Sequence, residues 1–184
     1  MNSILIVVDI QNGFTRYEQT QALAKKIAAL TNSGLFDKII ATRFLNKEGS
    51  QYVKFMHWRR LMDSPDIDLA DGIKADKVVD KWIYTCVDET FMDLLKELNN
   101  GEIPTHVFVC GADTDCCVLK TSTDLFEKGI MPLVLTQYCD SNAGPQAHEA
   151  GLMVMSRLVG KQSIVDAEID SKATIAKIIK EKQY

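Results

Sequence analysis

Short apolar runs alternate with longer amphipathic segments along most of the chain. The runs are rich in Val, Ile and Leu, as in strands that are covered on both faces. They predict five strands, at 4–9, 38–42, 78–81, 105–110 and 132–136, and a short sixth at 163–165. The amphipathic segments repeat apolar positions at helical spacing. They predict helices at 18–31, 88–99, 115–128, 145–157 and 167–181.

This order of elements predicts the fold class. Strands that alternate with helices form right-handed βαβ units, and their strands lie parallel in one sheet. We therefore expect a three-layer, Rossmann-like α/β fold with a central parallel sheet of about six strands flanked by helices. A chain of 184 residues without a repeat or linker is expected to form one domain, 1–184. The polar segment 46–76, with a short helix around 51–61, can serve as a pocket lid or as an interface.

Composition and charge argue against several classes of function. The chain is 46% hydrophobic and 25% charged, which is typical of globular proteins. Its net charge of −4 argues against nucleic acid or an anionic membrane as the main partner. No apolar stretch approaches the roughly 20 residues that cross a bilayer, and we find no signal peptide. The five cysteines lack the spacing of a metal site, which favours reduced thiols in the cytoplasm.

Three reactive side chains follow predicted strands. Asp9 ends the first strand, Lys81 ends the third, and Cys117 comes after the turn that closes the fourth. Ligands bind beyond the carboxyl ends of the strands in a parallel sheet. We therefore expect an acid, an amine and a thiol to converge at one edge.

Each of these side chains also has a structural explanation. Cys117 can be an inert buried thiol, but a helix N-terminus lowers the pKa of a thiol and offers N–H groups to an oxyanion. Asp9 can cap a turn, or act as a general base that takes the thiol proton and later activates water. Lys81 can reach the surface, or pair with Asp9 and so offset the cost of burying an ammonium group.

Other residues near the strand ends are candidates for binding a substrate. The guanidinium of Arg43 can hold a carboxylate with two hydrogen bonds, or form a surface salt bridge. His57 is a further candidate. The aromatic candidates, each of which can also belong to the core, are Phe14, Phe44, Trp58, Trp82 and Tyr138. We select Phe14, Arg43 and Trp82 as the substrate contacts.

Three segments together resemble a known family. Residues 111–118 resemble the nucleophile segment of the isochorismatase-like cysteine hydrolases, 7–14 resemble the family's first strand with its catalytic aspartate, and 79–85 resemble its lysine segment. The segments follow one another in the family's order and span most of the chain. One such motif is weak, whereas three at matching spacing are specific.

The resemblance implies a catalytic triad of Asp9, Lys81 and Cys117, with Cys117 rather than Cys116 as the nucleophile. In this scheme the thiol attacks an amide-type carbonyl, Asp9 passes the proton to the leaving amine, and water hydrolyses the thioester. The implied activity is hydrolysis of a small amide, ureido or related C–N bond, without a cofactor. Relatives of this kind form dimers or larger homo-oligomers, and we expect the same here.

The resemblance also bears on the oxyanion site and on metals. It implies a non-proline cis peptide bond between Ala112 and Asp113, which would aim the N–H groups of Asp113 and Cys117 at a developing oxyanion. Nicotinamidase-type members carry an Asp-x-His metal cluster after the second strand, which residues 42–46 lack, so we expect neither a catalytic metal nor a nicotinamidase. Members that cleave isochorismate, a vinyl ether, lack the nucleophilic cysteine, so Cys117 argues against that reaction.

Three other functions would each need particular features of the sequence. A non-catalytic family member, acting as a binding or assembly subunit, would have little reason to keep all three triad groups. A thiol redox protein would use Cys116 and Cys117, but adjacent cysteines form a strained ring and are rarer redox pairs than Cys-x-x-Cys. A nucleotide-binding module would need a Gly-x-Gly-x-x-Gly motif or a phosphate loop, and neither is present.

Overall fold

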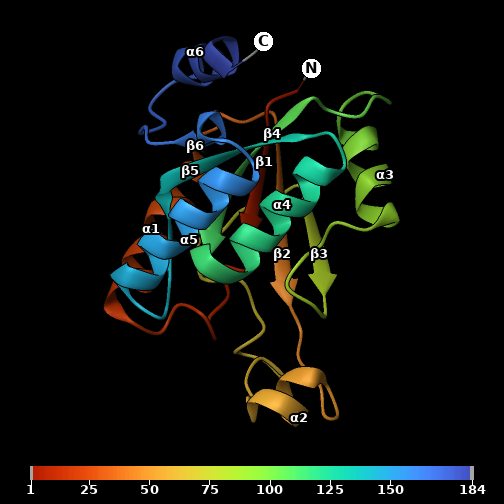
Figure 1. Ribbon diagram of the computed structural model, residues 1–184, viewed down its shortest axis with the longest axis vertical. Helices are drawn as coiled ribbons and strands as arrows, with labels where there is room; N and C mark the ends of the chain where they lie inside the picture. The colour runs from red at the N-terminus through yellow and green to blue at the C-terminus, as the bar shows by residue number, and fades with distance from the viewer. Residues whose placement is uncertain (1, 183–184) are drawn as a thin grey trace.

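The computed structural model describes residues 2–182, and within them six strands form one parallel sheet (Figure 1). The strands are β1 (Ile4–Val8), β2 (Lys38–Phe44), β3 (Lys77–Lys81), β4 (His106–Ala112), β5 (Met131–Asp140) and β6 (Ile164–Val165). Their order across the sheet is β3-β2-β1-β4-β5-β6. The two central strands, β1 and β4, are buried along their whole length. The predicted α/β fold class is confirmed.

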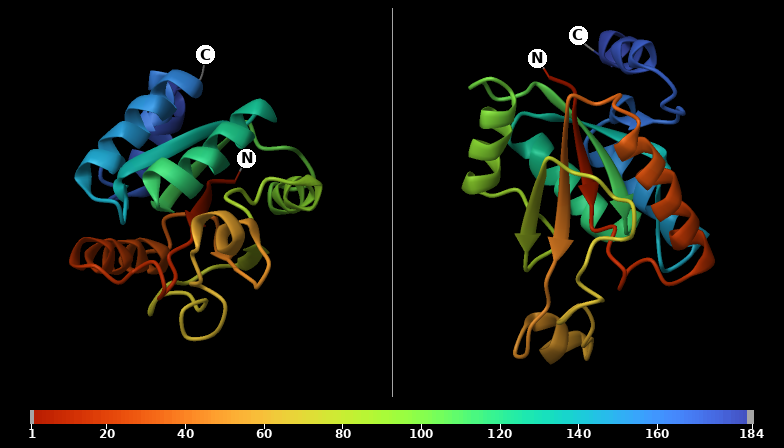
Figure 2. Two further views of the ribbon diagram at one scale, coloured as in Figure 1. Left: turned by 60° about the horizontal axis from the view of Figure 1, so that its bottom comes forward. Right: turned by 180° about the vertical axis from the view of Figure 1, so that it is seen from behind.

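Helices cover both faces of the sheet. They are α1 (Glu18–Asn32), α2 (Gln51–Met56), α3 (Glu89–Leu98), α4 (Leu119–Glu127), α5 (Pro145–Leu158) and α6 (Lys172–Lys182). Helices α4 and α5 pack together over β5, and α1 packs on the opposite face against β4 and β5 (Figure 2). None of the helices in residues 2–182 is long and apolar enough to cross a membrane.

Two predicted helices begin or end elsewhere than expected. The helix predicted around 51–61 ends at Met56, because His57 adopts the left-handed conformation (φ 53°) and forms its C-cap. The helix predicted at 167–181 begins only at Lys172. Residues before it form a non-helical segment, where the backbone N–H of Ile169 donates to the hydroxyl of Tyr138 at 3.2 Å.

The segments after β4 and β5 also differ from the prediction. The helix predicted at 115–128 is divided into a π-helical turn, η1 (Thr114–Val118), and α4. Strand β5 continues to Asp140, beyond the predicted end at 136, after a shift in its register with β4. Both differences lie at the carboxyl edge of the sheet, where the reactive residues were expected.

Gly111 allows the two central strands to lie close together at this edge. It pairs with Val8 across β1 and β4 and has a φ of +129°. A Cβ at this position would lie 2.1 Å from the carbonyl oxygen of Val8. Only glycine fits there, so the chain that leaves β4 is held against the chain that leaves β1.

The segment between β2 and β3 extends beyond the carboxyl edge of the sheet and carries α2 (Figure 1). The buried side chain of Gln11 anchors it to the end of β1. Its Nε2 donates to the carbonyl oxygens of Phe44 (3.0 Å) and Ile67 (2.9 Å), and its Oε1 accepts from the backbone N–H of Phe44 at 2.7 Å. The protruding segment is therefore tied at both its ends to the residues that follow β1.

Candidate active site

Asp9, Lys81 and Cys117 meet at the carboxyl edge of the sheet. The strand order reverses between β1 and β4, and ligands in such sheets bind at this switch point. The Nζ of Lys81 lies 2.6 Å from the Oδ2 of Asp9 and 3.6 Å from the Sγ of Cys117. Asp9 is 0% exposed, Lys81 3% and Cys117 4%. The three strand ends thus bring an acid, an amine and a thiol into one buried cluster.

The acid and the amine are fixed by further hydrogen bonds. The Oδ1 of Asp9 accepts from the Oγ1 of Thr42 at 2.7 Å, and that hydroxyl oxygen accepts from the backbone N–H of Asp9 at 3.1 Å. The Nζ of Lys81 donates to the carbonyl oxygens of Ile83 (3.1 Å) and Tyr84 (3.0 Å). The alternative in which Lys81 reaches the surface is wrong, because its ammonium group is enclosed and paired.

Burial and the neighbouring charges shift the pKa values of Lys81 and Cys117. Burial alone would lower the pKa of Lys81, but the neighbouring Asp9 and Cys117 outweigh burial, so the pKa is raised and the ammonium form is retained. Burial raises the pKa of Cys117 well above its usual value, and the charge of Asp9 and its hydrogen bond with the thiol raise it further. Lys81 lowers the pKa of the thiol only in part.

The expected lowering of the Cys117 pKa by a helix N-terminus is therefore wrong. Cys117 is the fourth residue of η1, and burial together with the carboxylate of Asp9 raises the pKa of its thiol. In the resting protein the thiol keeps its proton near neutral pH. The arrangement suits proton transfer from the thiol to Asp9 during a reaction rather than a thiolate formed in advance.

This arrangement predicts slow alkylation of Cys117 by iodoacetamide in the absence of substrate. Because its pKa is raised, its thiolate fraction at pH 7 is below that of an ordinary thiol with a pKa of about 8.5. The alkylation rate should rise about tenfold per pH unit from pH 7 to 9. Replacing Asp9 by Asn removes the charge that raises the pKa, so alkylation at pH 7 should become about tenfold faster or more.

Rates of alkylation are measured by intact mass with peptide mapping, in a Cys116→Ser background. This background is needed because Cys116 also lines the cavity, although burial raises its pKa to about 12. Alkylation of Cys117 at pH 6 that is faster than alkylation of free cysteine would contradict the assignment of charges. Slower alkylation of Cys117 in the Asp9→Asn variant would contradict it too.

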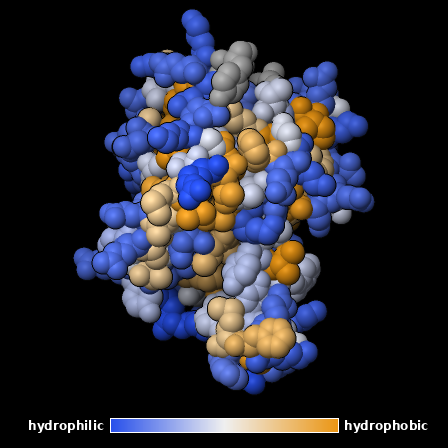
Figure 3. Space-filling view, in the orientation of Figure 1, coloured by the Kyte–Doolittle hydropathy of each residue, from blue (hydrophilic) through white to orange (hydrophobic). Residues whose placement is uncertain are grey.

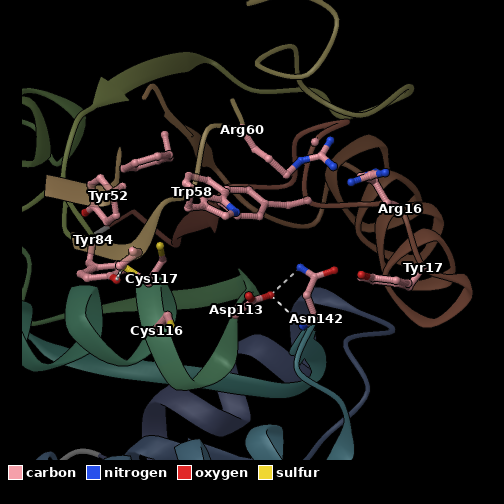
Figure 4. A pocket seen from close by; sticks show the side chains of 14 residues that line it. Arg16, Tyr17, Tyr52, Trp58, Arg60, Tyr84, Asp113, Cys116, Cys117 and Asn142 are labelled. Carbon is pink, nitrogen blue, oxygen red and sulfur yellow. Dashed lines mark hydrogen bonds between the residues drawn. The ribbon is translucent and has the colours of Figure 1, made fainter. Parts of the chain in front are cut away.

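A cavity of about 250 Å³ opens beside Cys117 (Figure 4). Six of its lining side chains are aromatic, and they come from three separate segments. They are Phe14, Tyr17, Phe44, Tyr52, Trp58 and Tyr84. The rings of Phe14 and Trp58 are stacked, with centroids 6.1 Å apart, and Tyr52 meets Phe44 and Tyr84 edge to face. The cavity therefore suits a small ligand with flat or apolar parts.

Of the three selected substrate contacts, Phe14 lines this cavity, whereas Arg43 and Trp82 do not. The guanidinium of Arg43 donates through Nε and Nη2 to the carboxylate of Asp80, at 2.7 and 2.9 Å, across the β2–β3 pair. Trp82 is 53% exposed outside the cavity. The expectation that Arg43 binds a substrate carboxylate is corrected, since Arg43 lies outside the cavity and forms the salt bridge that was its alternative.

Several polar or charged lining residues were not candidates from the sequence, namely Arg16, Tyr17, Tyr52, Arg60, Tyr84 and Asn142. The Nη2 of Arg60 donates to Asp66 at 2.8 Å. Asn142 donates from its backbone N–H and its Nδ2 to Oδ1 of Asp113, at 2.9 and 2.7 Å. Tyr52 and Arg60 lie in the segment 46–76, which was expected to form a lid or an interface. The others gave no signal in the sequence, because their neighbours depend on the path of long loops.

The backbone between β4 and Cys117 contains the cis peptide bond that the resemblance implied. The peptide bond between Ala112 and Asp113 is cis. The carbonyl oxygen of Asp113 accepts from the N–H groups of Cys116 and Val118, both at 3.1 Å. These bonds curl the chain into η1 and direct the side chain of Cys117 toward the cavity (Figure 4).

The donors around the cavity do not form a metal site. Within residues 2–182 no group of three or more His, Cys, Asp or Glu side chains is arranged to hold a metal ion. The residues after β2, at 42–46, include neither Asp nor His. The described residues therefore do not fit the metal cluster of nicotinamidase-type proteins.

A family model described as "Isochorismatase domain" matches residues 3–166. Solved structures with the same fold include an isochorismatase-like hydrolase from Alkaliphilus metalliredigens, with a TM-score of 0.72, 14% identity, and coverage of 96% of this chain and 98% of that one. A nicotinamidase from Bacillus subtilis has a TM-score of 0.71, 19% identity, and coverage of 87% and 97%. A cysteine hydrolase from Pseudomonas syringae pv. phaseolicola has a TM-score of 0.68, 18% identity, and coverage of 99% and 94%. The comparison with curated proteins finds no significant match.

Proposed function

The chain belongs to the isochorismatase family, and on this premise we propose that it is a metal-independent cysteine hydrolase of small amide, ureido or related C–N bonds. One observation carries the proposal. The ammonium group of Lys81 contacts both the carboxylate of Asp9 and the sulfur of Cys117, and this buried cluster faces an aromatic cavity. The names of two structural neighbours, a nicotinamidase and a cysteine hydrolase, agree with this chemistry.

The first half of the proposed reaction forms a thioester. Asp9 takes the proton of the Cys117 thiol as the sulfur attacks the carbonyl carbon of the substrate. The ammonium group of Lys81, 3.6 Å from the sulfur, stabilises negative charge on it during the transfer. The backbone N–H groups of Asp113 and Cys117 are assigned to the oxyanion of the tetrahedral intermediate. The C–N bond then breaks, and the leaving amine takes the proton held by Asp9.

The second half returns the enzyme to its resting state. Asp9 takes a proton from a water molecule, whose oxygen attacks the thioester carbonyl. The C–S bond breaks, and the sulfur of Cys117 recovers the proton from Asp9. The balance is one amide and one water consumed, and one carboxylic acid and one amine released. Lys81 does not act as the base, because its raised pKa keeps it protonated.

The alternative is a non-catalytic family member that serves as a binding or assembly subunit. A buried ion pair is costly unless it has a function or excellent hydrogen bonding, and this one faces a cavity that can hold a ligand. The segment 46–76 contributes Tyr52, Met56, Trp58 and Arg60 to the lining of the cavity. Phe55 and Met56 of α2 are 81% and 61% exposed, and Figure 3 shows apolar surface over this helix. The homo-oligomer, the single domain and the cytoplasmic location stay predictions.

The direct test of the proposal is a substrate screen with detection of the thioester. Primary amides and ureides are supplied, and release of ammonia is followed with a coupled assay. We expect turnover to survive dialysis against a chelator, and acid-quenched enzyme to carry the acyl group on the peptide that contains Cys117. Ammonia release that stops with chelation and returns with a metal would exclude the metal-independent mechanism. Saturable binding of amides without turnover or acyl adduct would favour the binding subunit.

A further inference from the structure

We propose that the cavity binds substrates that carry a carboxylate at the end opposite to the scissile amide, and that Arg60 and Arg16 recognise this carboxylate. The inference rests on the proposed function for its reacting end, and it adds the class of substrate: small, flat monoamides of dicarboxylic acids. Four observations support it, namely the layout of the cavity, an unpaired donor, the balance of charge and the stacked aromatic wall.

The cavity has a reactive end and a cationic end. Figure 4 shows Cys117 and Tyr84 toward one side, Arg60 and Arg16 toward the other, and Trp58 between them. All five side chains line the same cavity. A ligand whose carbonyl lies beside the sulfur would therefore extend along Trp58 toward the two guanidinium groups.

The guanidinium of Arg60 is fixed, and one of its donors is unused. Its Nη2 donates to Asp66 at 2.8 Å, which holds the orientation of the group. Its Nε is buried and, among the described residues, has no hydrogen-bond partner. A buried donor without a partner costs free energy, and a carboxylate oxygen in the cavity is an acceptor that would remove this cost.

The balance of charge at this end also favours an anion. Arg16 and Arg60 are the lining residues with a positive charge, and Asp113 is the lining residue with a carboxyl group. Oδ1 of Asp113 already accepts two hydrogen bonds from Asn142, and burial raises the pKa of this carboxyl group. Asp66 balances the charge of Arg60, so the positive charge that a ligand would meet at this end comes from Arg16, while the guanidinium of Arg60 offers a planar set of donors that matches the geometry of a carboxylate.

The aromatic wall restricts the part of the substrate between its two ends. The stacked rings of Phe14 and Trp58 present a flat apolar surface along the cavity. A volume of about 250 Å³ is below the roughly 300–1,000 Å³ of pockets that hold drug-sized ligands. Short, unsaturated spacers between the amide and the carboxylate fit this wall best.

The inference is tested with pairs of substrates that differ only in the distal group. The monoamides of fumaric and terephthalic acid are compared with the neutral amides crotonamide and p-toluamide. Wild type should prefer the carboxylate member of each pair in kcat/KM. Arg60→Gln should lower kcat/KM for the carboxylates about 10- to 100-fold, mainly through KM, and change the neutral amides by about twofold or less.

Two further variants make this result specific. Arg16→Gln changes an exposed side chain, so it tests the cationic end without disturbing a buried contact; it should act in the same direction with a smaller effect. Arg59→Gln is the matched control, because Arg59 is adjacent in sequence but pairs with Glu48 and does not line the cavity. Equal losses for both members of each pair, or no preference in wild type, would overturn the inference.

A binding experiment separates the inference from the proposed chemistry. Fumarate and terephthalate are titrated by calorimetry into the Cys117→Ala protein, alongside the corresponding neutral diamides. We expect the dicarboxylates to bind more tightly than the diamides, and we expect this preference to be lost when Arg60→Gln is added to Cys117→Ala. That result supports the carboxylate site even if no amide is hydrolysed. If amides are hydrolysed but the dicarboxylates bind no better than the diamides, the hydrolase stands and the carboxylate site does not.

Discussion

Replacing Cys117 by alanine is expected to lower kcat by about 10⁴-fold or more while the protein remains folded. No thioester can form without the sulfur, and the hydroxyl of Thr42, which also contacts Asp9, is fully buried and does not line the cavity. The change removes one sulfur atom and leaves the ion pair between Lys81 and Asp9 in place. Turnover is measured by ammonia release, and folding by circular dichroism and thermal unfolding.

Cys116→Ala provides the matched control for this loss. Cys116 also lines the cavity, but its Sγ lies 3.8 Å from the Oδ2 of Asp115 rather than beside Lys81. We expect Cys116→Ala to retain turnover within about threefold. If the two variants lose activity equally, or if Cys117→Ala retains wild-type turnover, the nucleophile has been assigned to the wrong residue.

Replacing Lys81 by methionine is expected to remove activity and to lower the free energy of unfolding by about 3–5 kcal/mol at pH 7. Methionine keeps most of the volume of lysine, so the loss arises from the carboxylate of Asp9, which stays buried without its counter-ion. The free energy of unfolding is measured by urea denaturation. Turnover is lost because the thiolate and the first intermediate lose the ammonium group that stabilises them.

The double variant Lys81→Met with Asp9→Asn separates the two effects. It removes both charges, so much of the stability should return, whereas activity should stay absent. Lys77→Met is the control, since Lys77 lies on the same strand, is exposed and pairs with Glu97 at 3.6 Å; such surface pairs contribute about 1 kcal/mol or less. A Lys81→Met protein as stable as the wild type would show that Asp9 is not held as a buried carboxylate.

The sheet and the reactive cluster were predictable because both follow from local patterns. Strands buried on both faces appear as unbroken apolar runs, such as Ile4–Val8, and parallel strands end at a common edge. The reactive residues Asp9, Lys81 and Cys117 each stand at or just after such a run. The alternation of strands and helices predicts a parallel sheet, and in a parallel sheet these three residues meet at one edge.

The contacts that individual side chains make with distant parts of the chain were not predictable in this way. Asp80 lies opposite Arg43 in the register of β2 and β3, so their salt bridge is apparent only once the strands are aligned. Arg60 reaches the cavity through a long segment whose path is set by the side chain of Gln11. The pKa of Cys117 depends on burial and on the charge of Asp9, which lies far from it in the sequence.

The anchoring of the protruding segment by Gln11 has a consequence for how this scaffold can diversify. The groups assigned to bond cleavage stand on the rigid edge of the sheet, whereas most of the aromatic and cationic lining stands on the chain between β2 and β3 and on the residues after β1. Gln11 holds the segment between β2 and β3 in place through backbone atoms of Phe44 and Ile67. This anchoring therefore does not depend on the side chains of those two residues. Mutation can therefore alter the lining of the segment freely while its docking persists, which makes this segment the natural place for laboratory evolution toward new substrates.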